Sequence, residues 1–410
     1  MTVPPTATAT TTTATATATG TVDPAPSPTA PPRRGARRRK ATALLIVAVV
    51  AAAVAGLAYA GSAPTAPPRS LPALARADAT AFLHRYLAAD GRVVRRDQGG
   101  DTVSEGQGYA MLLAVATGDR RAFARAWRWD RDHLQQGDGL FAYRWQAGRV
   151  TTAQPAADAD LDTAWALLLA AARFHEPAYR TAGLRVAAAV LATETATVAG
   201  RLQLAAGPWA VATPVAAPVA TPVAVDPSYL APEAVAAVGR ATGDHRWSAL
   251  ATDGTALLRR FRLPPDWVDL SGGAPRAVGT PTGRGRPVYG LDAQRSPVWL
   301  AASCDPADRA VAAADWPLLD HLSGHGAATR YTLSGHRLAR AVNPLGWVAT
   351  ASAAMAAGHR QAAVGLLGQA DRQAARYHTY YGDAWVALGR VLLTTGWLSG
   401  CPAEARFTSG

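Results

Sequence analysis

The 410-residue chain is poor in the residue types on which several large enzyme classes depend. It has two cysteines, Cys304 and Cys401, and these make no metal-binding motif. No P-loop and no dinucleotide fingerprint occurs. None of the nine histidines stands beside a serine or cysteine nucleophile motif. The sequence therefore gives no support to nucleotide-dependent or triad chemistry, and we expect neither a metal ion nor an organic cofactor. Outside the cytoplasm the two cysteines either pair or stay as two buried thiols.

Lysine is also scarce: Lys40 is the only one, so arginine carries nearly all of the formal charge of +12. Six basic residues stand together at positions 33–40, directly before an apolar run. No later stretch interleaves basic and aromatic residues as a nucleic-acid surface would. We therefore expect no nucleic-acid partner and attribute the basic cluster to membrane topology.

The apolar run covers residues 41–60 and contains no charge, which matches the thickness of a bilayer core. We expect residues 1–40 to form a disordered basic cytoplasmic tail and 41–60 a transmembrane signal anchor. A cleaved signal peptide is the alternative, because small residues end the run. Residues 61–71 are rich in proline and predict a linker. The domain at 72–400 is then extracytoplasmic, either membrane-anchored or secreted.

Aromatic residues make up only 7% of the chain and alanine dominates its apolar fraction, which favours helix over strand. From residue 71 on, apolar residues mostly recur at helical spacing. This pattern predicts about twelve helices, with starts near residues 72, 105, 119, 159, 178, 229, 244, 291, 305, 343, 359 and 380. Six hairpins of this kind predict a closed all-α barrel with one inner and one outer helix in each pair. Residues 211–225 and 271–287 interrupt the rhythm and predict surface loops.

Three places concentrate acidic, aromatic and glycine residues at predicted helix starts. The first is the segment SEGQGY (104–109), in which Ser104 and Gln107 have the spacing of a capping box. This box places Glu105 in the first helical turn, where an acid also suits the helix dipole. Gly106 and Gly108 reduce helix stability, so we expect them to allow close approach of a ligand or of another stretch of backbone.

The second place is Asp158, Asp160 and Asp162, which open a strongly apolar helix. Helix capping combined with solvated charge is one interpretation, and the pattern does not fit an EF-hand calcium loop. The third place is the segment YGLDAQR (289–295), where Asp292 and Arg295 have the spacing of a helix ion pair.

Glu105 and Asp158 lie one predicted hairpin apart, and Asp292 begins another inner helix. We therefore expect the three carboxylates to meet at one mouth of the barrel. Paired carboxylates across a groove are the groups that cleave glycosidic bonds.

The chain resembles glycoside hydrolase family 8 over about residues 72–398. Five segments carry the resemblance: SEGQGYAMLLAVATGD (104–119), AADADLDTAWALLLAAARF (156–174), DPSYLAP (226–232), PPDWV (264–268) and YGLDAQRSPVWL (289–300). Within the family the chain is most similar to the cellulase that accompanies bacterial cellulose synthases. Ala157 and Thr163 depart from the residues usual in the family, and neither change removes a carboxylate.

The resemblance implies an (α/α)6 barrel and endo-hydrolysis of a β-1,4-glucan with inversion. By its motifs Glu105 is the general acid, Asp158 holds the sugar and Asp292 is the general base, although some branches take their base from elsewhere. Six further residues are candidates for lining the groove, with core packing as the alternative for each: Tyr109, Trp165, Tyr229, Arg295, Tyr380 and Tyr381. Trp209 and Trp267 are weaker candidates.

Two other functions remain open from the sequence. One is xylanase or chitosanase activity on the same scaffold, although a domain of net charge +7 is a poor electrostatic match for polycationic chitosan. The other is a non-catalytic glucan-binding component of a cellulose-export system. A cellulose synthase apparatus is an expected partner in both the cellulase and the export interpretations.

Overall fold

The computed structural model describes residues 70–211 and 223–402. The predicted membrane segment at 41–60 lies outside these residues, as do the tail and most of the linker. Within the described residues no helix is long and apolar enough to cross a bilayer.

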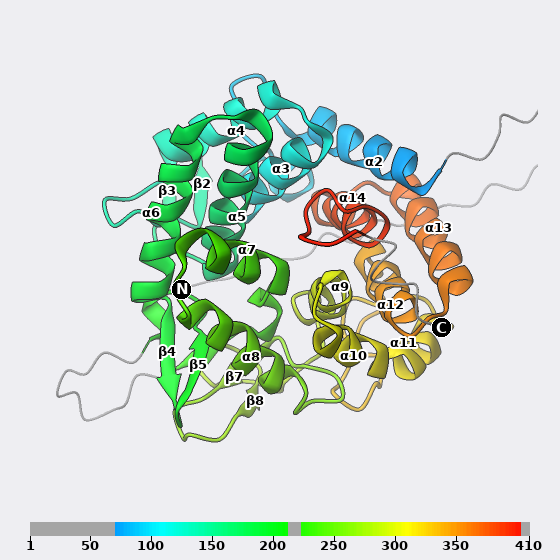
Figure 1. The fold of residues 1–410 in the computed structure, drawn as a ribbon. Helices are drawn as coiled ribbons and strands as arrows, with labels where there is room; N and C mark the ends of the chain where they lie inside the picture. The colour runs from blue at the N-terminus through cyan, green and yellow to red at the C-terminus, as the bar shows by residue number, and fades with distance from the viewer. Residues whose placement is uncertain (1–69, 212–222, 403–410) are drawn as a thin grey trace, which may run out of the picture. The chain divides into compact units, whose positions relative to one another are not determined.

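Helices dominate the described chain, and we number them as in Figure 1. The helices are α2 (Leu71–Tyr86), α3 (Ser104–Thr117), α4 (Arg120–His133), α5 (Ala157–Phe174), α6 (Pro177–Thr193), α7 (Pro232–Thr242), α8 (Arg246–Leu258), α9 (Ser296–Ala302), α10 (Pro306–Ala314), α11 (Trp316–Ser323), α12 (Pro344–Ala356), α13 (Arg360–Arg376) and α14 (Tyr380–Thr394). Four short 3-10 turns join them: η1 (Arg96–Gln98), η2 (Pro208–Ala210), η3 (Pro227–Tyr229) and η4 (Ala293–Arg295).

Six of these helices form a closed inner ring. Going around the ring, α3 contacts α5, α5 contacts α7, α7 contacts α9, α9 contacts α12, α12 contacts α14, and α14 contacts α3. The helices α4, α6, α8, α10, α13 and α2 each pack outside one inner helix (Figure 1). The predicted all-α barrel of six hairpins is therefore confirmed for the described residues.

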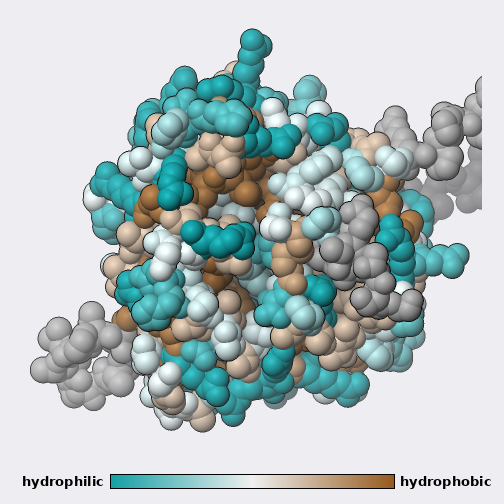
Figure 2. All heavy atoms as spheres, in the orientation of Figure 1, coloured by the Kyte–Doolittle hydropathy of each residue, from teal (hydrophilic) through white to brown (hydrophobic). Residues whose placement is uncertain are grey.

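The burial patterns explain which helix lies inside. In α14 nearly every residue is buried, as expected for a helix enclosed by neighbours on all sides. In α13 only one face is buried, formed by Ala363, Leu367, Ala370 and Ala374 at spacings of three and four. Figure 2 shows the molecule from the side seen in Figure 1. Hydrophilic side chains cover most of the periphery in this view, and hydrophobic ones appear chiefly toward the middle.

Short antiparallel strands connect some of the helices, and the sequence did not predict these strands. The strands are β1 (Thr102–Val103), β2 (Arg144–Gln146), β3 (Arg149–Thr152), β4 (Thr195–Val198), β5 (Arg201–Leu204), β6 (Ala224–Val225), β7 (Trp267–Asp269) and β8 (Arg276–Val278). They form the sheets β1-β2-β3, β4-β5 and β6-β7-β8. The register places Thr102 opposite Trp145 in the first sheet and Val225 opposite Val268 in the third. The predicted loops at 211–225 and 271–287 therefore include β6 and β8, while 212–222 lie outside the described residues.

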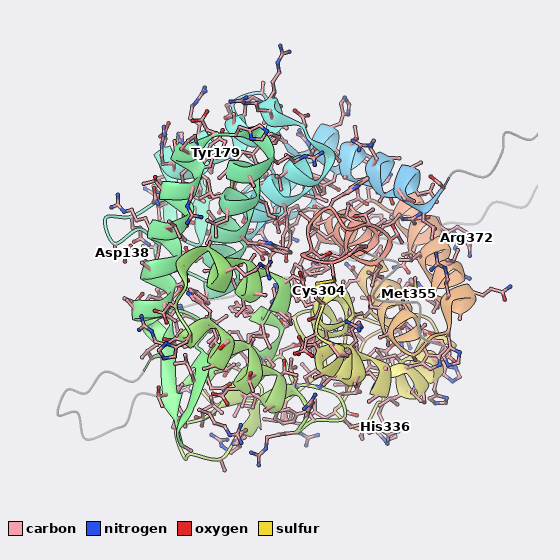
Figure 3. All side chains as sticks on the ribbon, viewed as in Figure 1. Asp138, Tyr179, Cys304, His336, Met355 and Arg372 are labelled. Atoms are coloured by element: carbon pink, nitrogen blue, oxygen red, sulfur yellow. A yellow bond between two sulfur atoms is a disulfide. The ribbon has the colours of Figure 1, made fainter. Side chains whose placement is uncertain are left out.

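The two cysteines, left open by the sequence, form a disulfide. Cys304 and Cys401 are 97 residues apart in the chain, and their Cα atoms are 5.9 Å apart (Figure 3 labels Cys304). The Glu233 carboxylate on α7 reinforces this link, because it accepts the backbone N–H of Cys304 at 2.7 Å and that of Gly400 at 3.0 Å. The disulfide and Glu233 thus join the end of α9 to the segment that follows α14.

Candidate active site

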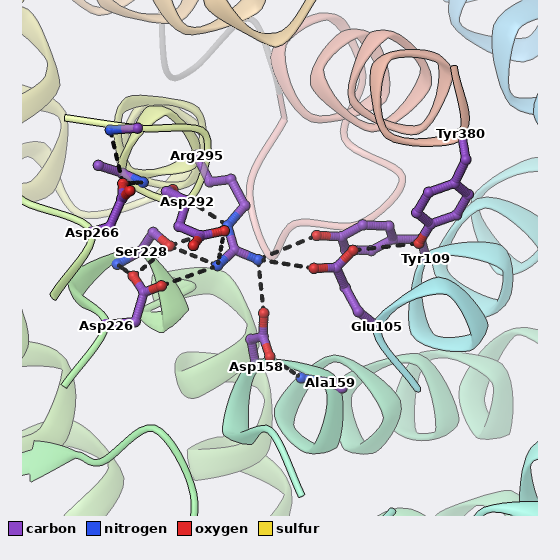
Figure 4. Close-up of polar contacts among 12 residues, drawn as sticks. Glu105, Tyr109, Asp158, Ala159, Asp226, Ser228, Asp266, Asp292, Arg295 and Tyr380 are labelled. Atoms are coloured by element: carbon purple, nitrogen blue, oxygen red, sulfur yellow. Dashed lines mark hydrogen bonds and ion pairs between the residues drawn. The ribbon is translucent and has the colours of Figure 1, made fainter. Parts of the chain in front are cut away.

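Four carboxylates surround the guanidinium group of Arg295, which is only 2% exposed (Figure 4). Its Nη1 donates to Asp158 Oδ2 at 2.7 Å and lies 3.4 Å from Glu105 Oε2. Its Nη2 lies 3.6 Å from Asp226 Oδ2 and 3.8 Å from Asp292 Oδ1. The structure thus brings together the three carboxylates expected at one mouth, and Arg295 lies between them rather than in an isolated helix ion pair with Asp292.

Glu105 is the second residue of α3, so it lies in the first turn as predicted. Its Oε1 accepts the hydroxyl of Tyr380 at 3.3 Å. Burial raises the pKa of Glu105 to about 7; Arg295 opposes this shift, and Asp158 and Asp292 add to it. Burial and the neighbouring carboxylates thus shift Glu105 toward its protonated form.

The predicted capping box is wrong. Val103 is the N-cap residue of α3 and no side chain caps this end. Gln107 instead accepts the backbone N–H of Val93 at 2.6 Å, and its amide N–H groups donate to the carbonyls of Gly91 and Ala126 at 3.1 and 3.0 Å. Tertiary hydrogen bonds to the preceding loop and to α4 therefore replaced the local bond that the spacing predicted.

The two glycines of α3 permit close packing, although the nearest atoms belong to side chains and not to another backbone as expected. A Cβ at Gly106 would lie 2.7 Å from the hydroxyl oxygen of Tyr380, and one at Gly108 would lie 3.3 Å from Cβ of Asp162. Gly106 thus admits the tyrosine that contacts the Glu105 carboxyl, and Gly108 admits helix α5.

The three aspartates at the start of α5 are all buried, which contradicts the interpretation as solvated charge. Asp158 faces Arg295, and its Oδ1 accepts the N–H of Ala159 at 2.9 Å. Asp160 accepts the N–H of Phe141 at 2.8 Å. Burial raises the pKa values of both Asp160 and Asp162 well above the usual range. Among the described residues no group of three acidic, histidine or cysteine side chains is arranged to hold a metal ion.

Asp292 precedes the turn η4, and with 43% of its side chain exposed it is the most accessible of the four carboxylates. Burial raises its pKa above the ordinary aspartate value, Arg295 opposes the shift, and Asp158 adds to it. The turn itself is held by Asp266, whose Oδ1 accepts the N–H groups of Gly290 at 2.8 Å and Ala293 at 3.0 Å. Asp266 therefore fixes the backbone on both sides of Asp292.

Asp226 and Ser228 are site residues to which the sequence reasoning gave no role. Asp226 is fully buried and its Oδ1 accepts the Ser228 hydroxyl at 2.7 Å. Ser228 Oγ in turn accepts hydrogen bonds from Nη2 of Arg295 at 2.8 Å and from Nε at 3.1 Å. The DPSY segment that carries both residues was the available signal, because an acid followed two residues later by serine at a turn forms such a pair.

The candidate groove residues lie at different depths. Tyr109 Oη is 3.4 Å from Arg295 Nη1, and the Tyr229 ring centre is 5.2 Å from the guanidinium carbon. Tyr380 contacts Glu105, and Tyr381 is partly buried. Trp165 lies instead in the core, fully buried and packed edge-to-face on Trp299, which is the core-packing alternative.

More exposed aromatic rings lie on segments adjacent to those that carry the site residues. Trp209 is 38% exposed, lies 6.5 Å from Trp267 between ring centres, and donates its indole N–H to the carbonyl of Pro155. Tyr143, which the sequence reasoning missed, is 36% exposed, and its carbonyl accepts the N–H of Ser104 next to Glu105. These rings provide apolar surface at the edge of a polar site.

Known proteins share both the sequence and the fold. The sequence profile of Glycosyl hydrolases family 8 matches residues 65–390. A probable endoglucanase from Novacetimonas hansenii is 33% identical over 233 residues, which cover 53% of this chain and 64% of that protein. An endoglucanase from Cellulomonas uda is 32% identical over 228 residues, covering 53% and 60%. The matches thus span less than two thirds of these relatives.

Two solved structures have the same barrel. Endo-beta-1,4-glucanase CMCax from Acetobacter xylinum superimposes with a TM-score of 0.66 at 24% identity, covering 78% of this chain and 98% of that one. Endoglucanase Cel10 from Klebsiella pneumoniae, a family 8 glycosyl hydrolase, gives 0.64 at 26% identity and covers 77% and 98%. Because the family profile matches most of the chain, including all three predicted carboxylates, the chain belongs to glycosyl hydrolases family 8.

Proposed function

We propose that this protein hydrolyses internal bonds of a β-1,4-glucan by an inverting mechanism. The observation that carries the proposal is the placement of Glu105 and Asp292 at different nitrogens of the Arg295 guanidinium, at 3.4 and 3.8 Å. Burial raises the pKa of Glu105 to about 7, which favours its protonated form. One carboxyl is thereby suited to donate a proton and the other to accept one. A carboxyl group that donates a proton and a carboxylate that accepts one are the two groups that hydrolyse a glycosidic bond.

In the proposed reaction Glu105 gives its proton to the glycosidic oxygen as the bond from C1 to that oxygen breaks. The bonding electron pair leaves with the oxygen, which departs as a hydroxyl group. Asp292 takes a proton from a water molecule, and the water oxygen bonds to C1 from the opposite face. The configuration at C1 is inverted, and the cycle ends when Asp292 releases its proton and Glu105 regains one from solvent. Inverting pairs stand roughly 6.5–9.5 Å apart to leave room for that water.

Asp158 and Arg295 have supporting roles in this proposal. Asp158 is fixed by Arg295 at 2.7 Å and by its own helix N-terminus, so its negative charge is held close to the developing positive charge at C1. Arg295 also contacts all four carboxylates, and its positive charge opposes the rise in pKa that burial causes at Glu105, Asp226 and Asp292.

The substrate is proposed from the family and its named relatives. The matched proteins from Novacetimonas hansenii and Cellulomonas uda are called endoglucanases, and aromatic rings at the edge of the site suit stacking on sugar faces. Xylan and chitosan are the alternative substrates on the same scaffold. A purely glucan-binding role is less well supported, because such a role requires no carboxyl group with a pKa near 7.

We also propose an extracytoplasmic location. The disulfide between Cys304 and Cys401 supports this, because such bonds persist in oxidising compartments. Membrane attachment through residues 41–60, or cleavage there, and association with a cellulose synthase apparatus remain predictions from the sequence.

The test is parallel assay of carboxymethylcellulose, xylan and chitosan for reducing ends and viscosity. We expect viscosity of carboxymethylcellulose to fall faster than reducing ends accumulate, and NMR to show the α-anomer as the first product. In Glu105→Gln the polymer rate should collapse while an aryl glycoside with a good leaving group is still cleaved, because it needs little protonation. Equal loss on both substrates, or a first product with retained configuration, would contradict the mechanism.

A further inference from the structure

A cavity of about 310 Å³ lies between the start of α12 and the end of α13. Trp347 from the first turn of α12 forms one side, and Arg372, Gln373 and Arg376 from α13 form the other. Tyr377, directly after α13, completes it. Its volume is at the lower end of the range for ligand sites, and none of the carboxylates around Arg295 lines it. The cavity is thus separate from the proposed catalytic centre.

The aromatic groups of this cavity are arranged as a binding surface. Tyr377 is 73% exposed, the highest value among the exposed large hydrophobic side chains of the described residues. Trp347 donates its indole N–H to Gln373 Oε1 at 2.7 Å, so the ring orientation is fixed without a ligand. The cavity thus places two aromatic rings beside polar groups, and tyrosine and tryptophan are enriched at binding surfaces because each ring has an apolar body and a polar end.

The charged groups of the cavity are two arginines, which are hydrogen-bond donors. Arg372 and Arg376 are one helical turn apart on α13, and Figure 3 shows Arg372 at the periphery of the barrel. Within residues 70–211 and 223–402, no carboxylate forms an ion pair with Arg372 or Arg376. Guanidinium groups beside aromatic rings can bind the hydroxyl groups of a sugar whose faces rest on the rings.

The cavity adjoins the catalytic site along the chain. Thr379 lines the cavity and caps α14, where its Oγ1 accepts the N–H of Gly382 at 3.1 Å. The next residue, Tyr380, places its hydroxyl 3.3 Å from Glu105. Pro344 and Thr379, which line the cavity, both pack against Gly382 in the first turn of α14. The cavity therefore lies at the same end of α14 as the tyrosine that contacts Glu105.

We propose that the cavity with Trp347 and Tyr377 is a second binding site for β-1,4-glucan, outside the catalytic centre. The identity of the ligand rests on the proposed function. A second contact on the same polymer raises the effective concentration of glucan at the catalytic site, so its effect falls on long chains and not on short ones.

The test compares Tyr377→Ala with Tyr377→Phe and with a control, Val364→Ala, which changes an exposed residue of the preceding helix α13. Retardation in native gels containing hydroxyethylcellulose, a neutral polymer, reports binding. The Glu105→Gln background prevents digestion during the run. We expect Tyr377→Ala to bind about tenfold more weakly, Tyr377→Phe to bind nearly as wild type because the ring remains, and Val364→Ala to be unchanged.

Kinetics in the active background separate the two sites. Tyr377→Ala should raise KM for hydroxyethylcellulose several-fold at unchanged kcat and leave kcat/KM for an aryl cellobioside unchanged. Unaltered binding and KM in Tyr377→Ala would overturn the second site. A loss seen only with carboxymethylcellulose and abolished by salt would also overturn it, because the arginines would then attract charge rather than glucan. If the unmodified enzyme cleaves no β-1,4-glucan, the proposed function itself fails.

Discussion

Gly290 lies directly against the carboxylate of Asp266, and its N–H donates to Asp266 Oδ1 at 2.8 Å. A Cβ at Gly290 would collide with that carboxylate, so only glycine fits the close approach. The contact matters because Asp266 also binds the N–H of Ala293, and Asp292 lies between the two donors. The position of the proposed base thus depends on a glycine two residues earlier.

We predict that Gly290→Ala moves Asp266 and the turn that carries Asp292. A displacement of about 1 Å at a catalytic group costs on the order of 10²-fold in rate. kcat should fall by about that factor while circular dichroism shows an intact barrel. Gly272→Ala is the control, because a Cβ there meets nothing within 4 Å. Wild-type kcat in Gly290→Ala would show that the position of Asp292 does not depend on this contact.

Ser228→Ala should weaken the placement of Arg295, since it removes the acceptor of Nη2 at 2.8 Å and the nearer acceptor of Nε at 3.1 Å. Arg295 lowers the pKa of Glu105, so a displaced guanidinium lets that pKa rise. We predict that kcat decreases and that the basic limb of the pH–rate profile moves to higher pH. Ser248→Ala on the exposed face of α8 serves as control. A lower kcat at an unmoved basic limb would mean that Ser228 supports the fold and not the electrostatics of Arg295.

Asp292→Asn removes the proposed base and keeps the shape of the side chain. General base contributions are about 10²–10⁴-fold, and we predict a loss of kcat in this range with glucan binding retained. The acid limb of the profile, which lies above the ordinary aspartate pKa because burial raises that of Asp292, should disappear. Near-normal activity would place the base elsewhere, with residues 271–287 as the region to search.

The raised pKa of Glu105 also predicts a pH-dependent stability. Its value is about 7 in the folded protein against 4.5 as the ordinary value, so the folded state holds more protons than the unfolded state between these pH values. Stability from this group is fully present below pH 4.5 and is lost as pH rises through 7. Glu105→Gln removes this dependence, so its Tm advantage over wild type should grow from pH 4.5 to pH 8. A constant Tm difference across that range would show that the buried carboxyl titrates normally.

The disulfide should contribute mainly to stability. It closes a segment of 97 residues, and loss of such a bond costs about 2–5 kcal/mol. We predict that the double variant Cys304→Ser and Cys401→Ser has a lower Tm but near-normal kcat at 25 °C, because Glu233 still binds both segments. Adding a reductant should lower the Tm of the wild type and leave that of the double variant unchanged. Equal Tm values before and after reduction would contradict a structural role.

The helix pattern was readable from the sequence because burial imposes a period on apolar residues. The predicted starts near 105, 159 and 380 lie within two residues of α3, α5 and α14. The short helix α11 was missed, since eight residues give too little periodicity to separate it from its neighbours. The strands were missed for a similar reason, because each has only two to four residues and gains its stability from pairing with distant segments.

What the sequence by itself determined is the barrel and three of the four carboxylates around Arg295, because helix period and the motifs around Glu105, Asp158 and Asp292 are local features. The tertiary structure decided how these groups behave. Arg295 contacts carboxylates from segments as much as 190 residues away in the chain. Gln107 forms hydrogen bonds outside its own helix and not the predicted capping bond. Asp226 and Ser228 hold the guanidinium of Arg295. A pKa depends on burial and on charges nearby in space, so the proton on Glu105 follows only from the folded arrangement.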